Sequence, residues 1–89
     1  MSIKNLVQNS SVEVYPNPSN GLLNLHTKNQ QNILQIEVTD MLGKLIDADV
    51  RGLNTNRVSV QFNTPTNGFY FVKINVDGYI ETTRVLLEN

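Results

Sequence analysis

Apolar and polar residues alternate along most of this 89-residue chain, and this alternation constrains its fold more than any other feature. The recurring sets are Val12 and Val14; Leu23 and Leu25; Leu34, Ile36 and Val38; Ile46, Ala48 and Val50; Val58, Val60 and Phe62; Tyr70, Val72, Ile74 and Val76; Thr83, Val85 and Leu87. Successive side chains of a strand point to opposite faces of the sheet, so each set marks one buried face. No segment combines helical periodicity with caps, and the sequence therefore predicts seven strands and essentially no helix.

Turn-forming residues separate these segments, a pattern typical of an all-β sandwich or barrel with antiparallel strands. Asp77 and Gly78 lie between two alternating runs and predict a tight hairpin with a type I′ turn. Residues 40–43 suit a short hairpin loop with Gly43 in the left-handed region.

The length of the chain allows one domain with a thin core. Residues 1–11 are polar and unpatterned, which indicates a linker or lead-in, followed by a domain at residues 12–89. No stretch has the roughly 18 apolar residues of a membrane-spanning helix, and residues 1–9 lack the apolar region of a signal peptide. The absence of cysteine excludes disulfides and thiolate metal sites.

The charges are few and scattered, with 7 Lys and Arg against 8 Asp and Glu and a net charge of −1. Nucleic-acid binders usually carry a clustered basic face, so we expect no nucleic-acid partner. No glycine-rich phosphate loop follows a strand and opens a helix, which argues against nucleotide binding. We expect no cofactor and no small-molecule substrate.

The residues capable of catalysis do not assemble into a recognisable site. His26 is the only histidine, and its phase places it on the polar face of its strand. Asp47 and Asp49 share one strand face, but they lack the glycine-hinged loop and the bidentate Glu of a calcium site. Alternating aspartates on a solvent face also protect sheet edges from unwanted pairing. The sequence therefore predicts that the domain is not an enzyme and holds no metal.

Phe69 and Phe71 are out of phase with the buried set of their own strand. On the outer face they could form a binding platform. A neighbouring element could equally cover them, and Leu22 is a candidate for that contact. The sequence leaves the two interpretations open.

The most unusual segment is residues 15–21, in which Pro16 and Pro18 fix two backbone angles just before Asn20 and Gly21 permit a reversal. By physical chemistry alone, this is a rigid turn at the exit of the first strand.

Four segments, in order, resemble the motifs of type A C-terminal sorting domains of the type IX (Por) secretion system of Bacteroidetes. The first motif is residues 14–21, the second 36–44, the third 67–74 and the terminal motif 83–87. The terminal motif has Arg84 where the family usually has Lys, and two residues follow it. The resemblance covers about residues 12–88.

The resemblance implies a seven-stranded immunoglobulin-like sandwich without catalytic activity. Such a domain directs the N-terminal passenger from the periplasm through an outer-membrane translocon to the cell surface or the extracellular space. A surface sortase, associated with outer-membrane shuttle components, then commonly removes the domain. The cut would fall in or before residues 1 to about 11.

By the same resemblance, the translocon or the sortase should read a specific set of residues. They are Tyr15, Pro16, Asn17, Pro18, Asn20, Gly21, Asp40, Gly43, Lys44, Gly68, Tyr70, Lys73, Arg84, Val85, Leu86 and Leu87. The terminal strand is the best candidate for an exposed edge that pairs with a partner or forms a homodimer. The alternative functions are an accessory carbohydrate- or protein-binding module of a secreted enzyme, and a structural spacer.

Overall fold

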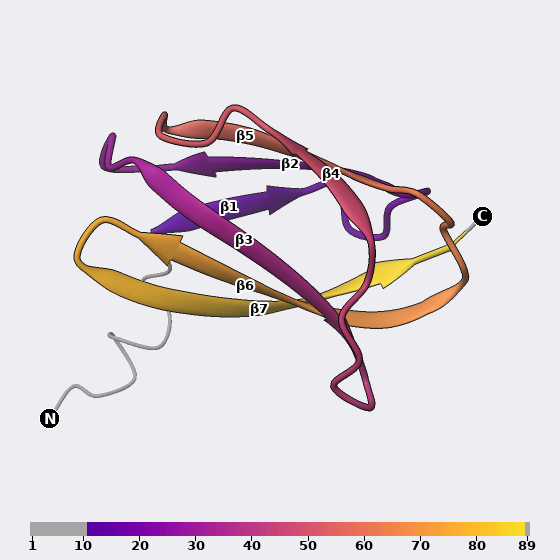
Figure 1. Cartoon of the computed structure of the whole chain (residues 1–89). Helices are drawn as coiled ribbons and strands as arrows, with labels where there is room; N and C mark the ends of the chain where they lie inside the picture. The colour runs from indigo at the N-terminus through magenta and orange to yellow at the C-terminus, as the bar shows by residue number, and fades with distance from the viewer. Residues whose placement is uncertain (1–10, 89) are drawn as a thin grey trace, which may run out of the picture.

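The computed structural model describes residues 11–88, which form two antiparallel sheets (Figure 1). The strands are β1 (Val12–Tyr15), β2 (Leu22–Thr27), β3 (Ile33–Asp40), β4 (Ala48–Arg51), β5 (Arg57–Phe62), β6 (Gly68–Val76) and β7 (Tyr79–Leu87). No helix occurs among residues 11–88, and the all-β prediction is confirmed. The expected lead-in lies outside the described residues except for Ser11.

The two sheets pack face to face around one hydrophobic core. One sheet has the strand order β1-β2-β5-β4 and the other the order β3-β6-β7. The buried hydrophobic residues are Val12, Leu23, Leu25, Ile33, Val38, Val58, Val60, Phe62, Tyr70, Val72, Ile74, Val76, Val85 and Leu87. These residues come from every strand except β4, and most belong to the alternating sets, because period-2 alternation places alternate side chains on the inner face.

The third alternating set differs from its prediction at its first residue. Leu34 is 41% exposed, whereas the neighbouring Ile33 is fully buried. The pairing with β6 shifts between Ile33 and Gln35, which makes Leu34 the extra residue of a β-bulge. The inward face of β3 therefore consists of Ile33, Ile36 and Val38, and the prediction that Leu34 faces the core is wrong.

The β6–β7 hairpin forms as predicted, with Val76 opposite Tyr79. Its turn is not of type I′, because Gly78 has a φ of 99° while Asp77 is not among the residues with positive φ. The Asp77 N–H donates to the carbonyl of Asn32 at 3.0 Å. The hairpin turn is thus tied to the β2–β3 connection, a contact that local turn preference does not include.

The turn after β3 also forms, and the chain then leaves the sheet. Gly43 has a φ of 89°, and its N–H donates to the carbonyl of Asp40 at 3.0 Å. Only the Thr39–Leu45 bridge continues a hairpin, after which the chain crosses to the other sheet. The predicted strand from Ile46 therefore begins at Ala48 instead, and β4 pairs with β5.

The strand directions define two ends of the sandwich. At the end that we call the motif end, β1, β3, β5 and β7 finish and β2, β4 and β6 begin (Figure 1). The other end, the entry end, carries the start of β1, the connections 28–32 and 52–56, and the β6–β7 turn. The first residue of β1, Val12, therefore lies at the opposite end from the first, second and terminal motifs.

Candidate functional site

The proline-containing loop between β1 and β2 folds across the motif end and joins the last strand. Ser19 forms a parallel bridge with Leu87. The Ser19 N–H donates to the carbonyl of Leu86 at 2.9 Å, and the Glu88 N–H donates to the carbonyl of Ser19 at 2.8 Å. The Leu86 N–H donates to Oδ1 of Asn17 at 3.0 Å. The loop thus clasps the C-terminal part of β7, and we call these bonds the clasp.

Ser19 is the residue that holds the clasp loop in shape. It is 2% exposed, one of the two buried polar residues among those described. Its hydroxyl donates to the carbonyl of Leu22 at 2.7 Å and accepts from the N–H of Gly21 at 3.1 Å. Sequence reasoning omitted Ser19 from the expected recognition residues. The usable signal was a hydroxyl residue within a turn, because Ser side chains often bond the backbone of their own turn.

Gly21 is required at the end of the same loop for two reasons. Its φ is 125°, which strains other residues, and a Cβ would lie 3.0 Å from Cβ of Pro65. Its carbonyl accepts from the N–H of Phe62 at 2.9 Å. Gly21 therefore fits the first motif tightly against the β5–β6 connection.

The clasp changes the expectation for the terminal strand. Val85 and Leu87 are each 1% exposed and face the core, and the Leu86 backbone is bonded to the loop. The prediction that the terminal strand offers an exposed pairing edge is therefore wrong for its C-terminal end, although β7 is the edge strand of its sheet. The prediction did not foresee that the β1–β2 loop, which is distant in the sequence, covers this part of the edge.

The second motif forms a tight turn organised by Asp40. Its Oδ1 accepts from the N–H groups of Leu42 at 2.8 Å and Lys44 at 2.9 Å. Its own N–H donates to the carbonyl of Lys44 at 2.9 Å. Asp40 lies opposite Tyr70 in the β3–β6 register, so this turn lies at the motif end.

The residues of the third motif lie partly in the core and partly on the outer face of the sheet. Tyr70 is 7% exposed, packs edge to face against Phe62 with 5.1 Å between ring centroids, and donates from its hydroxyl to the carbonyl of Thr66 at 2.7 Å. It therefore anchors the β5–β6 connection. Lys73 lies further along β6, exposed, with Nζ 4.0 Å from Glu37. The structure brings Gly68 and Tyr70 to the motif end but leaves Lys73 near the middle of the sheet.

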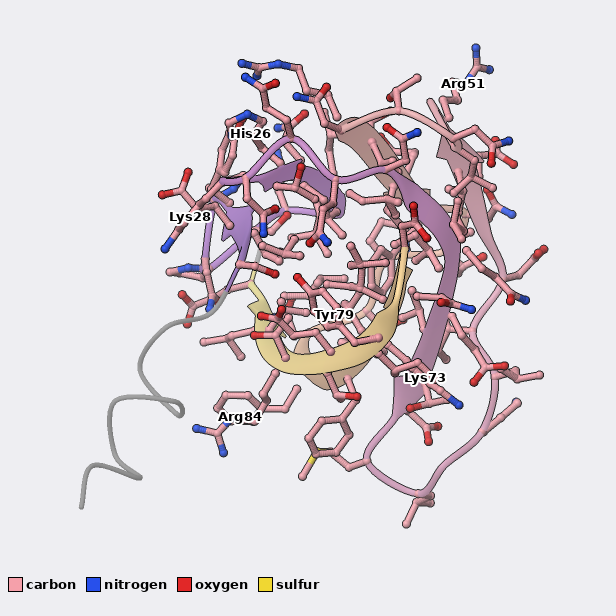
Figure 2. All side chains as sticks on the ribbon, turned by 90° about the vertical axis from the view of Figure 1, so that its left-hand side faces the viewer. His26, Lys28, Arg51, Lys73, Tyr79 and Arg84 are labelled. Carbon is pink, nitrogen blue, oxygen red and sulfur yellow. The ribbon has the colours of Figure 1, made fainter. Side chains whose placement is uncertain are left out.

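The aromatic pair lies on the outer face of the three-stranded sheet. Phe69 is 43% exposed, and the guanidinium carbon of Arg84 lies 4.7 Å from its ring centroid. Phe71 is half-buried opposite Arg84. Leu22 belongs to the other sheet and is not their companion. Figure 2 shows Arg84 and Lys73 on one side of the molecule and Arg51 on the other.

The remaining candidate residues do not gather into a chemical site. Nδ1 of His26 lies 3.9 Å from Oε1 of Glu13, and His26 is half-buried on the outer face. Asp47 and Asp49 are exposed. Among residues 11–88, no group of three His, Cys, Asp or Glu could hold a metal ion, and no helix could span a membrane.

A family of known proteins matches most of this chain. The family model described as a secretion system C-terminal sorting domain matches residues 13–88. These residues include all seven strands apart from Val12. A search of curated proteins finds no match for this chain.

Proposed function

Because this chain belongs to the family of secretion system C-terminal sorting domains, the sorting signals of type IX secretion, we propose that the export machinery reads its motif end. The match confirms the family resemblance of the sequence motifs. The domain directs an N-terminal passenger to the type IX machinery, and export leads to the cell surface or the extracellular space.

The observation that carries the proposal is the clasp. The Leu86–Asn17 bond joins residues 69 positions apart, so the first and terminal motifs form one surface only after the chain has folded. The Asp40 turn lies at the same end. A receptor for this surface would bind the folded domain and ignore an unfolded chain that contains the same motifs.

The expected recognition residues would then have two roles. Pro16, Asn17, Pro18 and Asn20 are exposed and can contact a partner directly. The buried members of the set act instead by positioning the surface. They are Gly21, Tyr70, Val85 and Leu87.

The position of the entry end supports the same interpretation. β6 spans nine residues, so the two ends of the sandwich lie about 25–30 Å apart at about 3.3 Å per residue. A translocon or shuttle component could hold the motif end while the passenger extends from the entry end. A surface sortase would cut in or before residues 1–11, after transit through the periplasm.

The sandwich itself is proposed to be immunoglobulin-like. The orders β1-β2-β5-β4 and β3-β6-β7 correspond to the ABED and CFG sheets of a constant-type domain. Tyr70 matches a tyrosine corner, since it lies near the start of the sixth strand and its hydroxyl bonds backbone four residues upstream. This fold serves many functions, and here it would act as a scaffold for recognition without catalysis.

The clasp limits which strand edges could pair with a second copy of the domain in a homodimer. Leu86 is engaged by the clasp, so a second copy would have to pair with β1, β3, β4 or an earlier part of β7. The alternative of a carbohydrate-binding module has less support, because Arg84 already occupies a face of Phe69 on which a sugar ring would stack.

The test fuses residues 12–89 to a periplasmic reporter in a bacterium with a type IX system. We expect the fusion to export the reporter and Asn17→Ala to reduce export several-fold, because it removes the acceptor of the Leu86 N–H. Asn32→Ala, an exposed asparagine at the entry end, is the matched control. Retention of an intact, folded wild-type fusion would contradict the proposal. Deletion of residues 85–89 is a poorer test, because it removes two core side chains.

A further inference from the structure

The turn after β3 displays apolar side chains at the motif end, and we propose that they insert into an apolar pocket of a protein in the export machinery. We call Met41, Leu42 and Leu45 the apolar tip. This inference rests on the proposed function and names the contact that the second motif would make.

The apolar tip is exposed to an unusual degree. Leu42 is 94% exposed, Leu45 62% and Met41 54%, and Leu42 has the highest exposure of the large exposed hydrophobic residues. Isolated surface hydrophobic residues are ordinary, but clustered ones mark interaction sites. The turn projects beyond the ends of the strands (Figure 1), where a partner can reach it from several directions.

Hydrogen bonds within the turn, two of them to the side chain of Asp40, hold the tip in shape. Oδ1 of Asp40 binds the N–H groups of Leu42 and Lys44, and the Gly43 N–H returns to the carbonyl of Asp40. A preorganised loop loses less conformational entropy on binding. Asp40 and Gly43 are therefore positioning residues, and the contact belongs to the apolar side chains between and beside them.

The surrounding charges favour a protein pocket over a lipid surface. Lys44 is exposed and has no ion-pair partner among residues 11–88. The carboxylate of Asp40 and the exposed carboxylate of Asp47 lie close to Lys44 along the chain. The tip therefore has no basic cluster that would attract anionic lipids. A convex apolar tip with one free cation fits a concave apolar pocket that carries a carboxylate on its rim.

The experiment compares serine variants in the passenger–reporter fusion. We expect Leu42→Ser combined with Met41→Ser to lower extracellular reporter about tenfold or more, while the folded fusion accumulates in the periplasm. Ile80→Ser is the matched control, since Ile80 is 58% exposed but lies at the entry end, and we expect normal export. Circular dichroism and thermal melts of the purified domains should match wild type, because the substituted side chains are exposed.

A second pair of variants tests the positioning role of Asp40. Asp40→Ala should lower export although the apolar tip is intact, and Asp40→Asn should restore much of it, because the amide oxygen can accept the same two bonds. Equal export by the wild type and the serine variant would overturn the inference. If the Asn17→Ala fusion stayed in the periplasm in the same experiment, the proposed function would stand and only this inference would fail.

Two other outcomes would also decide against the protein pocket. Flotation of the isolated domain with vesicles of phosphatidylethanolamine and phosphatidylglycerol, lost in the serine variant, would identify a lipid surface instead. Failure of the wild-type fusion to leave the periplasm would overturn both the proposed function and this inference.

Discussion

Replacement of Ser19 by alanine should weaken the clasp without removing any apolar side chain from the core. The change deletes one oxygen atom, which accepts from the buried N–H of Gly21 and donates to the carbonyl of Leu22. An unsatisfied buried donor costs about 1–3 kcal/mol, and a lost bond at the half-buried carbonyl costs about 0.5–1 kcal/mol. We therefore expect Ser19→Ala to lower the free energy of unfolding by about 2–3 kcal/mol.

Urea or thermal unfolding of the isolated domain measures this loss. For a domain of this size, 1 kcal/mol corresponds to about 4–8 °C, so Tm should fall by about 10–20 °C. Small domains typically have about 5–15 kcal/mol of stability, which would leave the variant folded at 25 °C. Hydrogen exchange adds local evidence, because the amide of Glu88 should exchange faster once the loop that holds its acceptor, the carbonyl of Ser19, is loosened.

Ser59→Ala provides the matched control for this prediction. Ser59 is half-buried on β5, and its hydroxyl has no hydrogen bond within the part of the chain that the structure describes. Its replacement should change stability by less than about 0.5 kcal/mol. If Ser19→Ala changed stability as little as this control, or left the exchange of Glu88 unaltered, the assigned role of Ser19 in the clasp would be wrong.

Two further predictions concern the backbone and the alkaline pH range. Gly52→Ala should destabilise the domain by about 2 kcal/mol or more, since Gly52 has a φ of 93° and a Cβ would lie 2.5 Å from the carbonyl oxygen of Arg57. Gly43 has a similar φ of 89° but open space around it, so Gly43→Ala should cost only about 1 kcal/mol. Equal losses of stability in urea melts of the two variants would show that the predicted steric clash at Gly52 is wrong. Burial, followed by the charge of Glu81, raises the pKa of Tyr79 above its ordinary value of about 10. The unfolded chain then loses this proton first, so the contribution of Tyr79 to stability is complete below about pH 10 and declines as pH rises through the folded-state pKa. Ultraviolet titration should show a late phenolate that Tyr79→Phe removes, and an unchanged titration in that variant would contradict the shift.

The inner face of most strands was predictable from the sequence because side-chain alternation is a local property. Val58, Val60 and Phe62 are buried as their spacing predicted. The turn at Gly43 was also predictable, since few residues other than glycine tolerate its backbone angle. Leu34 was misplaced because a bulge depends on the pairing of two strands, which no spacing within one strand reveals.

The candidate site was only partly predictable. The first motif was recognised by its residues, and its prolines and glycine indicate a rigid turn. The importance of Ser19 was missed, because its burial results from the approach of β7. The exposure of Leu42 was missed as well, because a turn prediction for residues 40–43 does not show whether other parts of the fold cover the side chains of that turn.

The sequence by itself determined the all-β class, most of the faces of the strands, the positions of the turns and the family, because these depend on side-chain period, backbone preference and motif order. Only the tertiary structure decided which strand edges are covered and which side chains of the motifs are displayed. The bond from Leu86 to Asn17 spans 69 positions of the chain. Such a contact depends on how two sheets pack and on where a loop crosses their end, and neither is encoded in the spacing of neighbouring residues.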